Sequence, residues 1–451
     1  MIGKDEIVGV LERSLAAAAG DEADAIVVAS ERNVTRFANS NVHQNMSEES
    51  GELVLRIIAD GKQGVASTSS FLDEDIRHTA SLALDMARRS ERLEGFTGLY
   101  GGNEPVAELP TFDEATSRLA DADKAHRLRA MFDEGTTKKV TFAGSFSTTV
   151  ASLAAGNTNG IRRWAPLTAA DLVTIAVADD TSGFATRMSR RSGDIDTMEL
   201  GREATDAALL RRHDRSDIDA GPWDVILGPP AMAEIFEWMN MITFTGQSYE
   251  DGSSFFVGNR DKQVLGVNCT LADDPLDPEF APFPFDAEGM PRRRNSLVEK
   301  GRVHGPVLDR LMADRLGLEP TANAASPGSD EHGIALHVSM AGGSASREEI
   351  IATTERGILV TRFHYLNGLI EPRTAMMTGM TRDGTFLIED GKVTKRLPNL
   401  RWTQSMVEAF SNIDTLSKER RIIGTWWNTF GGTLAPTVKI RGWKITGRSG
   451  A

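Results

Sequence analysis

The stretch VTRFANSNVHQNMSEESGELVLRIIADGKQGVAST, residues 34–68, is the most informative part of the chain because it places two tight turns between extended runs. The first turn is Asn39-Ser40. The second is Asp60-Gly61, a dipeptide that favours the two-residue turn of a β-hairpin. The run LVLRII before this second turn is rich in β-branched and aliphatic residues, as strands are. We therefore expect several consecutive antiparallel strands in this part of the chain.

Helices are predicted on both sides of these strands. Apolar residues recur at helical spacing over residues 5–19, which are followed by Gly20, and again over residues 73–89. The rest of this region is predicted to contain a strand at 25–30, a helix at 113–134, strands at 139–153 and 171–178, and a helix at 198–212. An order of helix, strands and helix is typical of an α+β layer.

The second half of the chain has a different pattern. A strand at 224–228 and a helix at 230–241 precede a long irregular stretch, which is rich in Pro and Asp at 273–291. Residues 344–357 are predicted to form a helix that begins with a capping box, Ser346 and Glu349, and ends at Gly357. Strands then dominate, with a hairpin at Asp390-Gly391 and a closing strand in PTVKIRGWKITG.

The predicted fold class is α+β with two domains. A chain of 451 residues is too long for one ordinary core. The polar segment RHDRSDIDAGPWD, residues 212–224, contains Gly221-Pro222 and is the best candidate for a boundary. We expect an N-terminal α/β layer with antiparallel strands at 1–215 and a mainly-β domain at 220–451.

Composition and charge exclude several classes of protein. The formal net charge is −14 and the densest basic clusters, 292–294 and 418–421, lack interleaved aromatics, so we expect no nucleic-acid binding. No apolar stretch approaches the roughly 20 residues needed to cross a bilayer, so we expect no membrane partner. The first residues place charges where a signal peptide needs apolar side chains, and Cys269 is the single cysteine. These features are typical of a cytoplasmic protein.

No pattern of ligands or nucleophiles announces an active site. The eight histidines form no HExxH or HExxxH pair. His332 and His337 are five residues apart, a spacing that makes them diverge on a helix and face opposite sides of a strand. Cys269 lies in the apolar run LGVNCTL and is expected to be a buried structural thiol in a strand. The sequence contains no G-x-S-x-G elbow.

Two groups of carboxylates leave two interpretations open. Asp273-Asp274 and the pair Asp286 and Glu288 could hold a hard cation such as calcium or magnesium. Asp beside Pro is also common turn chemistry, and this second interpretation is favoured.

Five blocks of the chain resemble the TldD/PmbA peptidase family. They are TRFANSNVHQN with the following DGKQGVAST, then GNTNG (156–160), then ADDPLDP with PFDAEGMPRRRNSLVEKG, and finally the segments SREEIIATTERGILVTRF and GTFLIEDGKVTKRLPNLRW. The blocks follow the family's order and span nearly the whole chain. The resemblance implies the family's two-domain fold.

The resemblance also implies a role within a pair of subunits. TldD-type chains carry HExxxH on a helix early in the C-terminal domain and bind zinc, whereas TldE/PmbA-type chains lack the motif. Here the corresponding window, LGPPAMAEIFEWMNMITFTG (227–246), contains Glu234 and Glu237 but no histidine. We expect both carboxylates to lie on a solvated edge of the helix. The resemblance therefore implies no catalytic residue, no metal ligand and no cofactor in this chain.

The implied activity belongs to a complex. A TldD-type paralogue carrying HExxxH would bind the zinc and hydrolyse unfolded peptide, and this chain would be its partner of the TldE/PmbA type. His43, Asn157 and Asn159 lie in family-like motifs and could contact a peptide backbone, although turn-forming roles are favoured for them. Two alternatives stay open: a metal-independent homodimeric hydrolase, and a binding or modulator protein without enzymatic activity.

Overall fold

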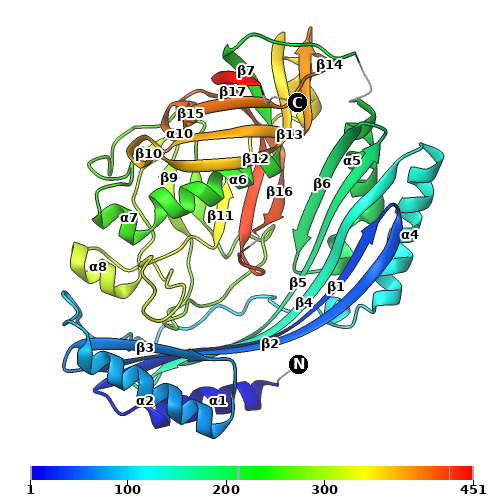
Figure 1. Ribbon diagram of the computed structural model, residues 1–451. Coiled ribbons are helices and arrows are strands. Elements are labelled where there is room, and N and C mark those ends of the chain that lie inside the picture. The colour runs from blue at the N-terminus through cyan, green and yellow to red at the C-terminus, as the bar shows by residue number, and fades with distance from the viewer. Residues whose placement is uncertain (1–2, 211–213, 426, 449–451) are drawn as a thin grey trace.

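The computed structural model describes residues 3–210, 214–425 and 427–448. Two β-sheets dominate it. A curved antiparallel sheet built from the N-terminal half lies along a β-rich C-terminal half, which occupies its concave side (Figure 1). The expected α+β class, with an antiparallel N-terminal layer and a mainly-β C-terminal part, is confirmed. The boundary at 215–220 stays a prediction.

The N-terminal sheet has six strands, each antiparallel to its neighbours, in the order β3-β2-β1-β4-β5-β6. Its strands are β1 (Glu22–Ala38), β2 (Asn41–Ala59), β3 (Lys62–Thr68), β4 (Thr141–Asn157), β5 (Arg162–Ala178) and β6 (Thr181–Ser189). Three of them, β1, β2 and β5, are far longer than the sequence pattern predicts. The strand expected at 25–30 and the run that begins at Val34 form a single strand, β1.

Both predicted turns of the N-terminal sheet are confirmed. Asn39 and Ser40 have φ of 48° and 56°, and Asp60 and Gly61 have φ of 52° and 70°. Positive φ at both central residues is the type I′ geometry, whose twist matches that of the flanking strands. A third tight turn at 179–180 leads into β6, a strand that the sequence analysis missed.

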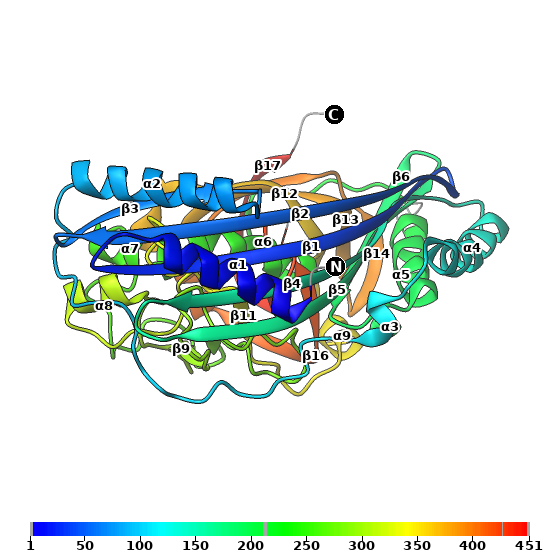
Figure 2. The same cartoon turned by 90° about the horizontal axis from the view of Figure 1, so that it is seen from below.

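Helices cover the convex face of this sheet (Figures 1 and 2). They are α1 (Lys4–Ala17), α2 (Asp73–Arg89), α3 (Glu114–Ser117), α4 (Asp121–Thr137) and α5 (Thr197–Leu210). Helix α2 has the predicted bounds. The single helix expected at 113–134 is wrong, because the chain breaks between α3 and α4 and lets Leu119 pack against the core. The helix predicted at 198–212 is α5, and its predicted end at residue 212 lies outside the described residues.

The C-terminal sheet has eleven strands. They are β7 (Gly221–Leu227), β8 (Leu271–Asp273), β9 (Asn295–Glu299), β10 (Arg302–Val303), β11 (His337–Met340), β12 (Arg356–Glu371), β13 (Met376–Glu389), β14 (Lys392–Arg396), β15 (Leu400–Ser405), β16 (Ile413–Gly424) and β17 (Gly432–Arg448). The hairpin at Asp390-Gly391 and the closing strand β17 are confirmed. Strand β7 pairs with both β12 and β17, so β7, β12, β13, β15 and β17 form a closed ring.

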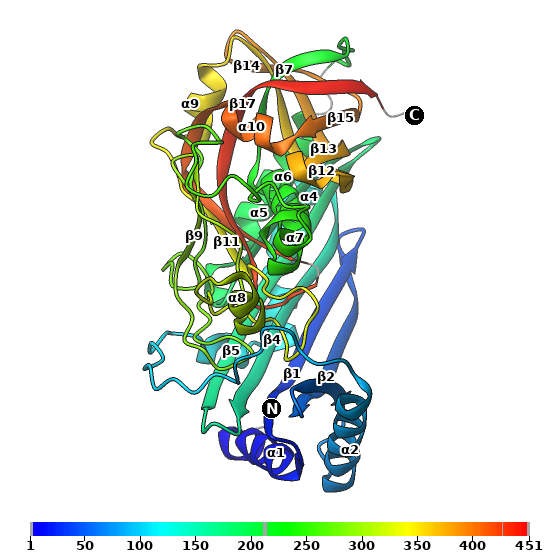
Figure 3. The same cartoon turned by 90° about the vertical axis from the view of Figure 1, so that its left-hand side faces the viewer.

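The C-terminal helices are short. They are α6 (Pro229–Met239), α7 (Gly246–Glu250), α8 (Arg310–Leu316), α9 (Arg347–Ala352) and α10 (Met406–Ser411). Helix α6 runs into a π-helical turn, Asn240–Phe244, and its apolar residues belong to the largest core of the protein. Figure 3 shows that α1 and α2 lie at the opposite end of the molecule from β7 and β17.

Two local expectations in this half are wrong. The capping box of Ser346 and Glu349 is present, but α9 ends at Ala352 and Gly357 lies in β12. Gly357 approaches the Asp224 backbone too closely to permit a side chain there without a shift, so it serves strand pairing rather than a helix end. Cys269 is buried as expected, but it lies in a loop between strands.

Within the described residues, no helix is long and apolar enough to cross a membrane.

We predict that Gly64→Ala destabilises the protein. A Cβ atom at position 64 of β3 would lie 1.9 Å from the carbonyl oxygen of Ala83 and 2.4 Å from the amide nitrogen of Ala87, both in the backbone of α2. Overpacking of this kind costs about 3 kcal/mol of unfolding free energy. Thermal or urea unfolding measures it, with Gly193→Ala as the control because nothing lies within 4 Å of a Cβ there. Equal stability of the two variants would contradict this account of the packing.

Candidate functional site

Helix α6 lies in the segment where family members that carry the zinc motif are expected to differ from those that lack it. Its Glu234 is packed against β12 and is not on a solvated edge, so that expectation is wrong for this residue. Burial raises the pKa of Glu234 to about 8, while Arg362 opposes the shift and Glu237 adds to it. A carboxyl group of this kind holds its proton at neutral pH.

The donors on α6 do not suit zinc. The helix presents two carboxylates and no imidazole or thiolate, whereas zinc sites in proteins are built mainly from His and Cys. Cys269 does not supply a thiolate, because complete burial raises the pKa of its thiol. Across residues 3–210, 214–425 and 427–448, no three His, Cys, Asp or Glu side chains are placed to hold a metal ion.

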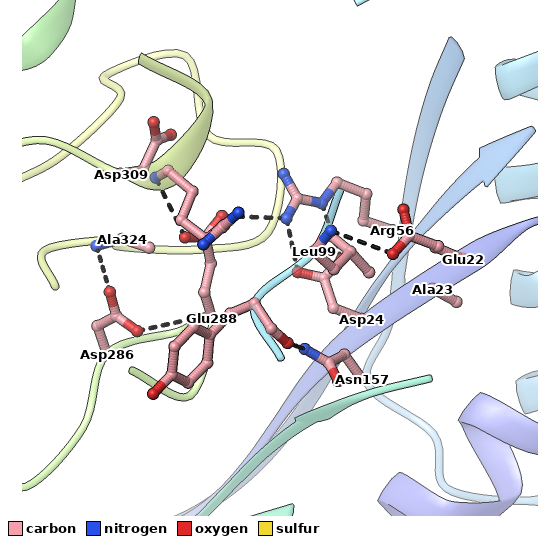
Figure 4. Close-up of polar contacts among 12 residues, drawn as sticks. Glu22, Ala23, Asp24, Arg56, Leu99, Asn157, Asp286, Glu288, Asp309 and Ala324 are labelled. Carbon is pink, nitrogen blue, oxygen red and sulfur yellow. Dashed lines mark hydrogen bonds and ion pairs between the residues drawn. The ribbon is translucent and has the colours of Figure 1, made fainter. Parts of the chain in front are cut away.

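A buried network of charges joins the two halves of the chain (Figure 4). Arg56 on β2 donates to both carboxylate oxygens of Asp24 on β1, at 2.8 and 2.7 Å. The same guanidinium donates to Glu288 of the C-terminal half at 3.2 Å. All three side chains are at most 6% exposed. Buried charges are stable only when they are paired and hydrogen-bonded, so this contact fixes how the halves sit.

The network holds more carboxylates than cations. Burial raises the pKa of Glu288 to about 8; Arg56 opposes the shift, and Asp309, Asp286 and Asp24 add to it. Burial also raises the pKa of Asp286, to about 6, although the amides of Glu288, Met290 and Ala324 donate to its oxygens. Of the two open interpretations, the cation site is not supported, because Arg56 already pairs with Glu288 and backbone amides donate to both oxygens of Asp286.

Asp273 belongs to a second buried pair. It accepts a hydrogen bond from Arg292 at 2.6 Å, and both side chains are fully buried. His337 lies beside them, and burial together with Arg292 lowers its pKa to about 3, so the ring is neutral. His332 instead contacts Asp309, at 2.9 Å. The two histidines therefore lie beside different carboxylates and share no site.

Asn157 and Asn159 shape a turn between β4 and β5. The Asn157 carbonyl oxygen atom Oδ1 accepts from the amides of Asn159 and Ile161, and its Nδ2 donates to the Tyr100 backbone at 2.7 Å. Asn157 is 1% exposed, and both its Oδ1 and its Nδ2 are hydrogen-bonded within the fold. Asn159 donates to Glu22 and to the Leu99 backbone, and it is exposed. Burial therefore keeps the side chain of Asn157 out of reach of a peptide.

His43 lies far from this turn. It is exposed on β2, and it is the extra residue of a β-bulge, since Val42 pairs with Phe37 while Gln44 pairs with Arg36. Asn157 pairs with Asp24 at the other end of β1, twelve residues from Arg36. At about 3.3 Å per residue, the two positions are about 40 Å apart. The three residues singled out from the sequence thus do not form one site.

A hollow that the sequence analysis missed lies where β6 meets β12 and β13. It has a volume of about 380 Å³ and is lined by Ser182, His364, Met380, Thr381, Arg382, Asp383 and Asn399. Ser182 of the N-terminal sheet donates to Asp383 at 2.6 Å and closes one side. No sequence pattern marks these residues, because pairing between distant strands brings them together.

We predict a pH-dependent contribution of Glu288 to stability. Its pKa is about 8 in the folded chain against an ordinary value of 4.5. Between these values the folded chain holds a proton that the unfolded chain releases, so this contribution to stability falls as the pH rises from about 5 to 8. Glu288→Gln removes the titrating group, and its melting temperature should vary less over that range.

Melting curves from pH 5 to pH 9 test this, with the exposed Glu355→Gln as the control for lost charge. Parallel pH profiles for the wild type and Glu288→Gln would show that Glu288 is ionised throughout.

Comparisons with protein families and with curated proteins identify relatives of this chain. A family model described as the PmbA/TldA metallopeptidase C-terminal domain matches residues 220–447, and one for metallopeptidase domain 1 matches residues 23–87. A metalloprotease of Methanothermobacter thermautotrophicus is 24% identical, covering 82% of each chain. The metalloprotease PmbA of Escherichia coli O157:H7 is 23% identical, covering 87% of this chain and 86% of that protein.

Solved structures show the same fold. The crystal structure of TldE from Thermococcus kodakarensis superposes with a TM-score of 0.86 at 21% identity, covering 97% of this chain and 99% of that one. A protein of Thermotoga maritima described as a putative modulator of a DNA gyrase gives a TM-score of 0.82 at 17% identity, covering 94% and 96%. With a domain model matching just over half of its residues, and with this fold, the chain belongs to the PmbA/TldD metallopeptidase family.

Proposed function

We propose that this protein is the TldE/PmbA-type subunit of a cytoplasmic two-subunit peptidase, and that it is not itself the catalytic chain. The observation that carries the proposal is α6, where two carboxylates and no imidazole stand in the window of the family's zinc motif. A TldD-type paralogue with HExxxH would bind the zinc and carry the hydrolysis. The metalloprotease names of the curated relatives support the reaction class.

The substrate we propose is unfolded peptide. Support comes from the edge of the N-terminal sheet, where β3 pairs with β2 only over Leu53–Ala59. The preceding part of β2, residues 41–52, pairs with β1 on one side and with no described strand on the other. An open edge can add a peptide strand through backbone hydrogen bonds, which makes binding tolerant of sequence. His43 lies on this edge and is exposed, so it stays a candidate peptide contact, as does the exposed Asn159 at the other end of the sheet.

The main competing function is a hydrolase that works without a metal. Glu234 favours it, since a buried carboxyl group with a pKa of about 8 is the kind of group that serves as a general acid.

We predict that the chain purified alone binds zinc well below one ion per subunit, because α6 offers no imidazole or thiolate. Elemental analysis after dialysis against a weak chelator measures the ratio. A stoichiometric ion would contradict the assignment of zinc to the partner.

We predict that replacing Glu234 and Glu237 together with Gln leaves peptide cleavage by the co-purified pair nearly unchanged. Gln keeps the size of the protonated Glu234 but cannot give up a proton to a substrate. The same exchange at the Glu of the partner's HExxxH should lower turnover by about 10² to 10⁴. The assay is turnover of an unstructured peptide, with assembly of the pair checked by size-exclusion chromatography.

Loss of cleavage in a double Gln variant that still assembles would place Glu234 or Glu237 in the reaction and would favour the metal-independent hydrolase. Absence of cleavage by any pairing would instead favour a modulator without enzymatic activity.

A further inference from the structure

Two hollows meet on the outer face of the C-terminal ring. The first is the polar one between β6, β12 and β13. The second has a volume of about 460 Å³ and is lined by Tyr365, Asn367, Leu369, Ile370, Thr378, Gly379, Met380 and Arg401. Met380 lines both, and it pairs with His364 on β12 and with Arg401 on β15. The two hollows therefore adjoin at Met380 across three adjacent strands, and together we call them the β12–β15 groove.

Arginines lie in both halves of this groove, since Arg382 lines the polar hollow and Arg401 lines the other one. Arg362 is held by Asp383, to which its Nε donates at 2.8 Å. Arg382 lies 3.8 Å from the same carboxylate, which is already shared with Arg362 and Ser182. Arg401 forms no ion pair with any described residue. Arg382 and Arg401 thus stand over the groove without full neutralisation, on a chain whose net charge is −14.

The pKa of His364 is affected by the same positive charges. The pKa of its imidazole lies below the usual range because burial and the guanidiniums of Arg382 and Arg362 disfavour a third positive charge. An anion is therefore the ligand that this end of the groove favours.

The other half of the groove is apolar and exposed. Tyr365 is 80% exposed, Leu369 is 65% exposed and Ile370 is 51% exposed. The pairing of β12 with β13 slips between His364 and Asn367, and Tyr365 itself has φ of 60°. A left-handed backbone is costly for a bulky residue, and bulges often turn side chains toward a binding site. The backbone thus holds Tyr365 out from the strand.

We propose that the β12–β15 groove binds an acidic segment of peptide. Arg382 and Arg401 hold a carboxylate, and a large apolar side chain next to it packs on Tyr365 and Leu369. The carboxylate is either the peptide's C-terminus or an Asp or Glu side chain, since both present the same two oxygens to a guanidinium. The inference rests on the proposed function for the identity of the ligand as peptide, and it adds a preference for charge and for apolar neighbours.

The test is fluorescence anisotropy of a rhodamine-labelled peptide, Gly-Ser-Gly-Ser-Leu-Asp, titrated with the chain alone at low salt. Three further peptides have the terminal carboxylate amidated, the Asp replaced by Asn, or both changes. We expect the doubly neutral peptide to bind at least about tenfold more weakly, the loss typical of a charge-assisted hydrogen bond. The two single changes assign the effect to the terminal or the side-chain carboxylate.

Variants of the groove locate the binding. Arg382→Gln and Arg401→Gln should each weaken binding of the acidic peptide by about tenfold and leave the doubly neutral peptide unaffected. Tyr365→Asn should weaken binding of every peptide, and Asn accepts a left-handed backbone, so the strand should be preserved. Arg129→Gln on α4 is the control, because its side chain is 76% exposed and lies in the N-terminal half.

Three results would overturn the proposal. The first is equal affinity for the acidic and doubly neutral peptides. The second is unchanged affinity for the acidic peptide in both arginine variants. The third is that Tyr365→Asn dissociates a subunit complex while peptide binding is unchanged. The last would show that a protein subunit covers the groove. Because the titration uses this chain alone and measures no cleavage, it separates failure of the groove from failure of the peptidase assignment.

Discussion

Arg56 in the floor of the N-terminal sheet binds the carboxylate of Asp24 and the side chain of Glu288, and this buried contact holds the two halves of the chain together. It is the point at which the floor of the N-terminal sheet is bonded to the long irregular stretch of the C-terminal half. Removing one member of a buried pair leaves a charge without water or partner, at a cost of about 3–5 kcal/mol. The halves are consequently fixed in one arrangement, and the concave face of the sheet keeps a defined distance from the ring of strands.

In that arrangement, the side chains of helix α6 indicate whether this chain can bind a metal. Helix α6 packs inside the ring, and Glu234 on it lies against the strand that carries Arg362 and His364. A helix with imidazoles at such positions offers donors that suit zinc, whereas α6 offers two carboxyl groups, of which Glu234 holds its proton at neutral pH. The difference between a catalytic and a supporting chain can thus come from side chains on one unchanged helix.

Local signals predicted the local parts of this fold. The type I′ turns at Asn39-Ser40 and Asp60-Gly61, the amphipathic helix α2 and the capping box of α9 depend on neighbouring residues, so the sequence was sufficient. Strand β6 and the burial of Glu234 depend on pairings between residues far apart in the chain, which periodicity does not report. The β12–β15 groove was missed for the same reason: Arg382, Arg401 and Tyr365 are unremarkable in sequence and become neighbours only in the sheet.

The ring of strands also determines the order in which the two halves can fold during synthesis. Its first strand, β7, lies between β12 and β17, so the ring cannot close until β17 has left the ribosome. The N-terminal sheet and the helices that cover it end at α5, so this layer can form while the second half is still being synthesised. During that interval β7 and the apolar α6 lack their partners, and a chaperone or the finished sheet must shield them from aggregation.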